Sequence, residues 1–443
     1  MRIKLGMPLS LSEIARATDG TLNVKDEIIS HISTDTRELF KNDLFVAVNG
    51  ADGFAKMAKD LGAFTLSKGA DADIRIPIET ASLLKIAFYY TKKLPYLLYR
   101  IAITGSVGKT TTKEFSKIIL SERYRTHANA GNYNNSIGLP LSVLQAPIDT
   151  QILIMEMGMN HFGEIAKLSE CFQPDIAIIT NIGTAHIGNL GSRENIAKAK
   201  LEITAGVNTV NIFVSHEEEL LKNVDGRISV STASREADYT LLNENNNVYL
   251  FTRKEHLLTS EFRFQEQHHI IDLAYACSLA SFLGLDAKEI ADGISKISDD
   301  NIRQKVVFGS NFCFYVDCYN SSLESIEALY NTAKRYRDGS PKSLLLGDIL
   351  ELGNHSKDIH LAAGRKIPKD IFRSVFLFGE YAENVKEGVI ASGFPANRIF
   401  INHDYSLPEI TAEQIKANCS SGEIIFMKAS RAVKLERILD YFI

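Results

Sequence analysis

Residues 101–112, IAITGSVGKTTT, combine side-chain types that could hold phosphate. An apolar β-type run ends in a turn with two glycines, Gly105 and Gly108, and a helical pattern begins at Lys109. Because glycine allows positive φ and close backbone approach, the N–H groups of such a turn and of the helix start can point at an anion. Lys109 adds a positive charge, and Thr110 supplies the hydroxyl that ligates Mg²⁺ in phosphate loops. The sequence therefore predicts a nucleotide phosphate site.

The loop departs from the standard phosphate-loop pattern at its first position. The pattern G-x-x-x-x-G-K-[ST] needs a glycine at 103, where this chain has Ile103. Strand, loop, Lys-Thr and helix nevertheless occur in the required order, so a phosphate loop is favoured over a strand-turn-helix corner with a surface lysine. The sequence has no N-K-x-D stretch for guanine, and ATP is therefore the better candidate nucleotide.

Two further polar residues follow apolar runs that we expect to be strands of the same sheet. Glu156 follows the run 152–155, and His186 ends the polar segment after the run 176–180. Ligands of open α/β sheets bind beyond the carboxyl ends of the strands, so this pair could hold a divalent metal against the phosphates. A solvated acid and a structural histidine are the alternative interpretations.

Composition limits the class of protein. The chain has 443 residues, enough for about three domains, and a net charge of −5, which argues against binding to nucleic acid. Its five scattered cysteines include no C-x-x-C pair, so neither a disulfide framework nor a zinc site is indicated. No apolar run is long enough for a signal segment or a membrane span. We expect a cytoplasmic enzyme with no membrane insertion.

The elements that must position these residues alternate between β-type and helical runs, which predicts an α/β protein. We expect three domains, at 1–97, 98–302 and 303–443. The first should be a small α/β unit with helices at 11–17, after the N-cap Ser10, and at 78–93. The predicted strands are 44–48 in the first unit, 100–104, 152–155, 176–180 and 210–214 in the second, and 314–316, 344–346, 375–378, 399–401 and 424–427 in the third.

Two other segments complete this outline. Short β-type runs around 243–247 indicate a hairpin on the second domain, which a helix at 268–283 closes. The hydroxyl-rich segment 33–37 ends in an arginine and suits a loop for a sugar or diphosphate. A solvated turn explains the same composition equally well.

Seven segments together resemble the Mur ligase family. They are 104–112, GNYNNSIGLPL at 131–141, EMGMN at 156–160, 180–186, 194–202, LGDILELG at 346–353 and 427–436. The resemblance covers essentially the whole chain. It implies a UDP-substrate domain, a central phosphate-loop ATPase domain with a mostly parallel sheet, and a C-terminal Rossmann-like domain.

The resemblance also implies an activity, an ATP-dependent ligase of peptidoglycan synthesis. ATP would phosphorylate a carboxylate, and an incoming amine would then attack the acyl phosphate. The implied substrates are a UDP-linked muramoyl peptide and D-alanyl-D-alanine, and the implied cofactors are ATP and two Mg²⁺ ions. We expect a monomer.

Site roles follow from the same resemblance. Lys109 would hold the β and γ phosphates, Thr110 one Mg²⁺, and Glu156 with His186 the other. Lys200 matches a family lysine that CO₂ carbamylates, a step that needs a neutral amine and that nearby cations would favour. From the residues alone, Lys200 would be a solvated helix lysine.

The remaining roles concern the substrates and the nucleotide. Asn134 and Asn135 resemble asparagines near the acyl-acceptor end, while Arg303 and Asp317 resemble residues that grip phosphate and ribose. Because these two belong to the third domain, we expect domain closure over the nucleotide. The nucleotide-binding candidates are Thr104, Gly105, Ser106, Val107, Gly108, Lys109, Thr110, Thr111, His269, Arg303 and Asp317, and the metal candidates are Thr110, Glu156, His186 and Lys200. The catalytic candidates are Lys109, Lys200, His186, Asn134 and Asn135, and the substrate candidates are Ser33, Thr34, Thr36, Arg37, Asn320, Lys428 and Ser430.

The departures from the family pattern gather at positions that, by the resemblance, would contact the substrates and the nucleotide base. They are Phe54, Ser136, His269, Asp272, Ile302, Ser322, Leu323 and Ala429. Two alternatives therefore stay open: a Mur-like ligase for a different carboxylate and amine, and a nucleotide-binding relative whose catalysis has decayed. The presence of Glu156, His186 and Lys200 argues against the second.

Overall fold

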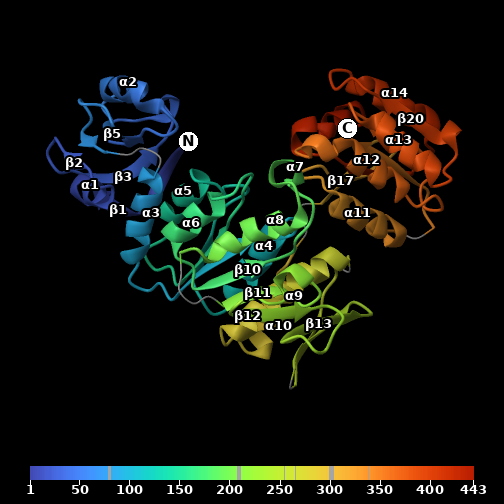
Figure 1. The fold of residues 1–443 in the computed structure, drawn as a ribbon, viewed down its shortest axis with the longest axis horizontal. Coiled ribbons are helices and arrows are strands. Elements are labelled where there is room, and N and C mark those ends of the chain that lie inside the picture. Colours follow the sequence, from blue (N-terminus) through green and yellow to red (C-terminus); the bar gives the residue numbers. More distant parts are fainter. Residues whose placement is uncertain (78–80, 207–210, 254, 265, 299–303, 338) are drawn as a thin grey trace.

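The computed structural model describes residues 1–443 except 78–80, 207–210, 254, 265, 299–303 and 338. Its described strands form three sheets, and the central lobe lies between the other two (Figure 1). The strands of each sheet lie within one of the three predicted domain ranges. The boundaries between the ranges stay a prediction, and Arg303 lies outside the described residues.

The first sheet has six strands in the order β1-β3-β4-β5-β6-β2. The helix predicted at 11–17 is confirmed as α1, and it begins in a capping box in which Ser10 and Glu13 each accept a hydrogen bond from the other's backbone N–H. Asn49 and Gly50, both at positive φ, follow the predicted strand β4. The elements are β1 Arg2–Ser10, α1 Leu11–Ala17, β2 Thr21–Leu22, β3 Ile28–Ser33, β4 Leu44–Val46, α2 Ala55–Asp60, β5 Phe64–Ser67, β6 Ile74–Arg75 and α3 Ser82–Lys92.

The central sheet has nine strands in the order β15-β14-β13-β12-β11-β10-β7-β9-β8. It is parallel from β8 to β13, and the predicted hairpin adds the antiparallel strands β14 and β15. The strands are β7 Tyr99–Thr104, β8 Thr126–Ala128, β9 Ile152–Glu156, β10 Ile176–Ile179, β11 Asn211–Ser215, β12 Arg227–Ser231, β13 Tyr239–Glu244, β14 Asn247–Thr252 and β15 His256–Glu261. The helices are α4 Lys109–Leu120, α5 Gly138–Leu144, α6 Glu164–Phe172, α7 Ile187–Leu190, α8 Arg193–Leu201, α9 Gln267–Phe282 and α10 Ala287–Ser295.

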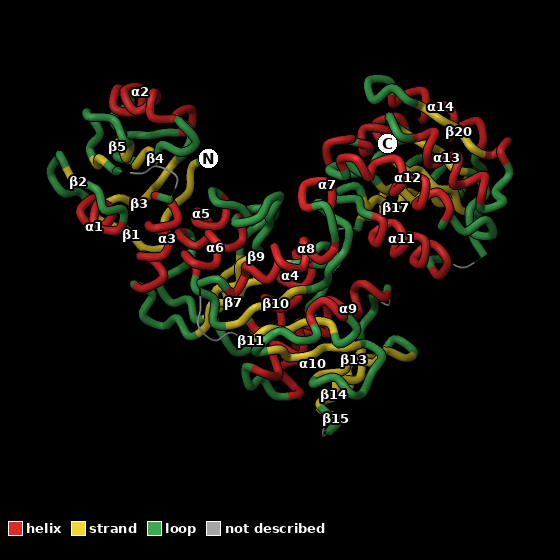
Figure 2. Tube along the Cα trace, viewed as in Figure 1, coloured by secondary structure: helices red, strands yellow, loops and turns green. Residues whose placement is uncertain are grey.

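Helices cover both faces of this sheet (Figure 2). Alternate residues of a strand point to opposite faces, and in β7 Ile101 and Ile103 join the core under α4 and α9, whereas Ala102 joins the core under α5 and α6. Burial on both faces explains why the parallel strands are continuous apolar runs.

The third sheet has six strands in the order β16-β17-β21-β18-β19-β20, parallel except for the edge strand β16. Ser322 stands where the Mur ligase resemblance implies an asparagine, and it is the N-cap of α11 and accepts a hydrogen bond from Ser325 N at 3.3 Å. Serine and asparagine are both good N-caps, so this departure preserves the helix start. The elements are β16 Lys305–Phe308, β17 Cys313–Asp317, α11 Leu323–Arg335, β18 Lys342–Gly347, α12 Ser356–Arg365, β19 Val375–Phe378, α13 Ala382–Ala391, β20 Ile399–Asn402, α14 Pro408–Asn418 and β21 Ile424–Lys428.

The first two units share one apolar core. Helix α3 packs against α5 and α6 of the central unit. Tyr90 of α3 is fully buried, and its hydroxyl donates to the carbonyl oxygen of Ala146 at 2.6 Å. Burial raises the pKa of the Tyr90 phenol to about 12. Among the described helices, none has both the length and the apolar character that crossing a bilayer requires.

We predict that Tyr90→Phe lowers the free energy of unfolding by about 1 kcal/mol, because the buried Ala146 carbonyl loses its hydrogen-bond donor. The measurement is the urea midpoint followed by circular dichroism. Tyr96→Phe is the matched control, since Tyr96 is 56% exposed. Equal midpoints for Tyr90→Phe and the native protein would contradict the prediction.

Candidate active site

The loop between β7 and α4 has the conformation of a phosphate cradle. Gly105 and Gly108 have φ values of +149° and +82°, and α4 begins at Lys109. A Cβ atom on Gly105 would lie 1.9 Å from the Thr180 hydroxyl oxygen, and one on Gly108 would lie 2.4 Å from a carboxylate oxygen of Asp272. Both sites therefore admit only glycine, for reasons of φ and of space.

The two residues that follow β10, the strand next to β7, hold this loop in place. The side-chain oxygen of Asn181 accepts from the backbone N–H groups of Ser106 and Val107, each at 3.0 Å. The hydroxyl of Thr180 donates to the carbonyl of Val107 at 2.6 Å. Lys109 folds back over the loop, and its ammonium donates to the Gly105 carbonyl at 2.7 Å. Sequence reasoning did not single out Asn181, whose role depends on strand order.

A buried carboxylate lies beside the first turn of α4. Glu156 is 1% exposed, and its Oε2 accepts from the Thr110 hydroxyl at 2.5 Å. Its Oε1 accepts from the side-chain amide of Asn134 at 2.8 Å. Asn135 has a different task, since its side-chain oxygen accepts from the N–H groups of residues 137 and 138 at the start of α5. The structure thus joins Thr110, Asn134 and Glu156, while Asn135 holds the backbone before α5 and its predicted role stays a prediction.

A buried cation lies near this carboxylate. Lys113 of α4 is 0% exposed, and its ammonium lies 3.2 Å from Glu114 Oε1 and 4.0 Å from Glu156 Oε2. It also donates to the backbone carbonyl of Asn129 at 2.5 Å. The Asn129 side chain in turn holds the backbone N–H and C=O of Glu156, at 2.9 and 3.1 Å. Buried charges need such partners, yet nothing in the sequence pattern distinguished Lys113 from a solvated helix lysine.

The donor set at Thr110 and Glu156 fits Mg²⁺. Both supply oxygen ligands, and Mg²⁺ in nucleotide sites is usually held by one or two carboxylates together with phosphate oxygens and water. Among the described residues no cluster of three or more His, Cys, Asp or Glu side chains could hold a metal by itself. A metal here would therefore depend on the phosphates of a nucleotide.

His186 contacts a residue of the third unit. It precedes α7 at a φ of +65°, and its Nδ1 is 2.7 Å from Oε2 of Glu351, a residue of the third unit. Contact with the His186 ring lowers the pKa of the Glu351 carboxyl. The contacts of the described residues thus pair His186 with Glu351, and its predicted partnership with Glu156 stays a prediction.

Lys200 in α8 is 2% exposed, so it is not a solvated helix lysine. Burial and the positive charge of Lys109 lower the pKa of its ammonium well below the ordinary value. Among the described residues the Lys200 amine has no hydrogen bond or ion pair. A lowered pKa favours the neutral amine, which is the form that can react with CO₂.

A second glutamate of the third unit holds the same segment of the central unit. Glu324, in the first turn of α11, accepts from the backbone N–H and the hydroxyl of Thr184 at 2.9 and 3.0 Å. Together with the Glu351 contact to His186, it fixes residues 184–186 from across the boundary between the two units. Because these contacts join residues 140 or more positions apart, the sequence offered no signal for them.

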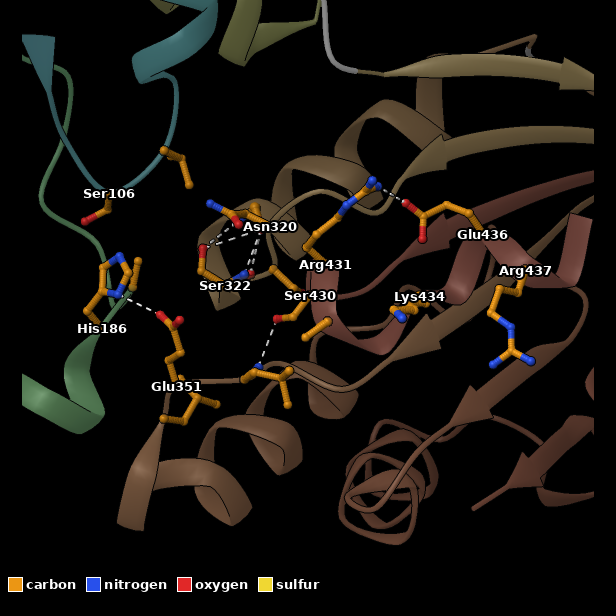
Figure 3. Close-up of a pocket in the computed structure, with 17 residues that line it drawn as sticks. Ser106, His186, Asn320, Ser322, Glu351, Ser430, Arg431, Lys434, Glu436 and Arg437 are labelled. Carbon is orange, nitrogen blue, oxygen red and sulfur yellow. Dashed lines mark hydrogen bonds and ion pairs between the residues drawn. The ribbon is translucent and has the colours of Figure 1, made fainter. Parts of the chain in front are cut away.

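A cavity of about 630 Å³ lies between the loop and the third unit (Figure 3). The central unit contributes Ser106, Val107 and His186 to the cavity wall, and the third unit contributes Asn320 and Ser430 among others. Ser430 accepts from the backbone N–H of residue 350 at 2.9 Å. Two of the predicted ligands, Lys428 and Asp317, are not among the residues that line the cavity. Lys428 is buried, and its ammonium donates to Asp317 Oδ2 at 2.9 Å and to the Asn320 carbonyl at 2.7 Å.

The predicted base-reading histidine faces a core. His269 is buried, and its two ring nitrogens lie 3.2 Å from Glu266 Oε2 and 3.1 Å from Gln304 Oε1. Asp272 accepts from the Thr112 hydroxyl at 2.9 Å, next to the Gly108 turn. Asp272 therefore supports the loop, and a direct contact of His269 with a base stays a prediction.

The predicted substrate residues of the first unit form a compact turn after β3. Ser33 Oγ donates to the Asp35 carbonyl at 2.9 Å, and the Arg37 guanidinium donates three hydrogen bonds to the Asp35 carboxylate. This pairing lowers the pKa of the Asp35 carboxyl. Thr36 begins the short helix Thr36–Glu38, and Thr34 Oγ1 accepts from the N-terminal amine. The substrate role of these residues stays a prediction.

Comparison with known proteins agrees with this arrangement. The family model for the Mur ligase middle domain matches residues 103–277, the part that contains the loop, Glu156, His186 and Lys200. The UDP-N-acetylmuramoyl-tripeptide–D-alanyl-D-alanine ligase of Bacillus subtilis is 31% identical over 97% of this chain and 96% of its own. The ligase of that name from Treponema pallidum is 30% identical over 98% of both.

Solved structures share the fold. The chain superposes on MurF from Acinetobacter baumannii with a TM-score of 0.87, at 24% identity and 99% coverage of both chains. For MurF ligase from Thermotoga maritima in complex with ADP, the TM-score is 0.80 at 23% identity, with 93% and 96% coverage. The phosphate loop and the three-sheet fold define a nucleotide-dependent ligase, and the chain belongs to the Mur ligase family. Within it, the chain is similar over its whole length to the UDP-N-acetylmuramoyl-tripeptide–D-alanyl-D-alanine ligases.

We predict that Glu324→Ala loosens the segment around Thr184, because the Thr184 N–H loses its acceptor. Amide exchange of a peptide covering 180–190, measured by mass spectrometry, should accelerate about tenfold, which corresponds to about 1.4 kcal/mol. Glu327→Ala is the control on the same helix, since Glu327 pairs with Lys366 inside the third unit. Unchanged exchange in Glu324→Ala would show that the contact between the units contributes nothing to the order of this segment.

Proposed function

We propose that this protein uses ATP to join D-alanyl-D-alanine to a UDP-N-acetylmuramoyl tripeptide. The observation that carries the proposal is the similarity to ligases of that name along the whole chain. The loop at 105–109 and the contact of Thr110 with Glu156 add the parts that phosphoryl transfer needs. Such transfer depends on positioning and charge neutralisation rather than on covalent help from the protein.

The proposed reaction has two steps. A carboxylate oxygen of the tripeptide attacks the γ-phosphorus of ATP, which gives an acyl phosphate and ADP. The neutral amine of the dipeptide then attacks the acyl carbon, the amide bond forms, and inorganic phosphate and a proton leave. Lys109 and the N–H groups at the start of α4, which Asn181 does not engage, would hold the β and γ phosphates. Thr110 with Glu156 would hold one Mg²⁺, which when bound offsets the phosphate charge.

We assign Lys200 a role through its buried amine. A neutral amine adds CO₂ and loses a proton, which turns a cation into an anionic carbamate. With His186, the carbamate would supply ligands for a second Mg²⁺. Burial of Lys200 and the lowered pKa of its amine support this assignment.

The outer units would bind the rest of the substrates. We propose that the 1–97 unit binds the UDP group through Ser33, Thr34, Thr36 and Arg37. The 303–443 unit would contact ribose and phosphate through Asp317 and Arg303, with Asn320, Lys428 and Ser430 near the peptide. Asn134, through Glu156, and Asn135, through α5, would shape the acyl-acceptor end. The enzyme would act as a monomer in the cytoplasm on peptidoglycan precursors, and so serve cell shape and division.

A ligase for another carboxylate and amine remains the second candidate, because Phe54 and Ser136 depart from the family pattern in regions that would read the substrate. A decayed nucleotide binder is less well supported. Selection for binding alone would not require Lys200 to stay buried and unpartnered beside Lys109.

The test of the proposed function is phosphate release by the purified protein with ATP, Mg²⁺, UDP-N-acetylmuramoyl tripeptide and D-alanyl-D-alanine. We expect one phosphate per amide bond and no release when either substrate is omitted. Tripeptides with different third residues should be compared in parallel. Release only with another carboxylate and amine pair would refute the specific assignment and keep the ligase.

We predict that Lys200→Ala lowers kcat at least about 100-fold, on the scale of losing a group that stabilises transition-state charge. A small added carboxylate such as acetate should restore part of the rate, and depletion of CO₂ should slow the native enzyme. Lys198→Ala, on the same helix, is the control. Full activity of Lys200→Ala would remove the carbamate from the mechanism.

A further inference from the structure

Residues 184–188 belong to the central unit by sequence, but their polar contacts are with the third unit. Thr184 donates twice to Glu324, and Nδ1 of His186 lies 2.7 Å from Glu351 Oε2. Among the described residues, the other hydrogen bonds of this segment stay within its own turn of the chain. In Figure 1 the helix α7, which this segment begins, lies against the third lobe.

The backbones of the two units also meet at a pair of glycines. A Cβ atom on Gly188 would lie 2.5 Å from the backbone nitrogen of Gly353, and one on Gly353 would lie 3.2 Å from Gly188 Cα. The close fit of α7 to the short helix Gly353–His355 therefore requires glycine at 188. Ile187 packs against the apolar core of the third unit and against the core that the first two units share.

The two ends of this segment are fixed to the central unit. The Gly183 N–H donates to the Ser106 hydroxyl at 2.9 Å, and the side-chain amide of Asn195 donates to the Leu190 carbonyl at 2.7 Å. Gly191 follows at a φ of +85°, with open space where a side chain would lie. Glycine at each end allows the backbone to rotate, and a few residues of this kind form the hinges of domain motions.

Both residues of the ion pair across the boundary have a left-handed backbone. His186 and Glu351 each have a φ of +65°, and their side chains face each other (Figure 3). This conformation is unfavourable for a residue with a Cβ, so it persists where surrounding contacts compensate for it. The two strained turns are therefore formed against one another, and the segment and the third unit make one continuous contact.

We propose that residues 184–188 move with the third unit, so that His186 changes its distance from the phosphate loop when that unit changes position. The consequence for catalysis rests on the proposed function, in which His186 binds a metal, but the coupled motion does not. Glu324, Glu351 and Gly353 are then positioning residues for the His186 ring. One predicted metal ligand arrives with the third unit, whereas the oxygens beside α4 stay with the loop.

The experiment measures distances between spin labels in the full chain by pulsed electron paramagnetic resonance. The labelled variants combine, in pairs, Asn189→Cys in the segment, Lys369→Cys in the third unit and Lys167→Cys in α6, all at exposed positions. The background carries Cys171→Ser and Cys419→Ser, since the other three cysteines are buried. Each pair is measured without ligand, with Mg²⁺ and a non-hydrolysable ATP analogue, and with UDP-N-acetylmuramoyl tripeptide added, or with the carboxylate that supports phosphate release in its place.

We expect the distance from 189 to 369 to stay constant, while the distances from 167 to 189 and from 167 to 369 change together when the ligands bind. A constant distance from 167 to 189 with a changing distance from 167 to 369 would show that the segment stays with the loop, and would overturn the proposal. Constant distances in all three pairs would also overturn it. Phosphate release only with another carboxylate would refute the proposed function and leave the coupled motion standing.

A matched pair of glycine variants tests the contact itself. Gly353→Ala places a methyl group against Gly188, so we expect it to broaden the distribution of distances from 189 to 369. It should also lower kcat about tenfold or more, because the His186 ring loses its fixed place. Gly393→Ala is the control, since Gly393 has a similar φ of +84° in the same unit but open space around it. Equal results for the two variants would show that the glycine contact does not hold the segment, and would overturn the proposal.

Discussion

The buried carboxylate of Glu156 is the constraint on which the centre of the molecule depends. A carboxyl side chain that is 1% exposed needs hydrogen-bond partners, and the central unit supplies them. Thr110 and Asn134 hold its two oxygens, and Lys113 provides a buried positive charge nearby. The first turn of α4, the end of β9 and the segment before α5 are therefore fixed relative to one another. The oxygens that we propose as metal ligands are arranged by the fold.

The conformation of one segment of the central unit depends on contacts with the third unit. Segment 184–186 belongs to the central unit, yet Glu324 and Glu351 of the third unit hold it at Thr184 and His186. The Glu351 contact engages Nδ1 of His186 and leaves Nε2 as the ring nitrogen that could hold a metal. The position of the third unit therefore affects how the His186 ring is oriented.

Local rules explain the parts of the fold that the sequence predicted well. The capping box at Ser10 and Glu13 fixes the start of α1 within one turn, and the alternation of apolar runs with helical segments predicted the strands around the loop. Glycines at 105 and 108 were informative because no other residue fits their φ and their neighbours. The turn at 33–37 was less informative, since the same hydroxyl-rich sequence is expected whether the side chains stabilise a turn or bind a substrate.

The sequence by itself determined the α/β class, the phosphate loop with Lys109 and Thr110, and the family. Each depends on neighbouring residues, whose spacing survives in the linear chain. Only the tertiary structure decided that Lys200 is buried, that Lys113 lies near Glu156, that His269 faces a core, and that the third unit holds Thr184 and His186. Burial and charge pairing depend on residues far apart in the chain, which only strand order and the packing of units bring together.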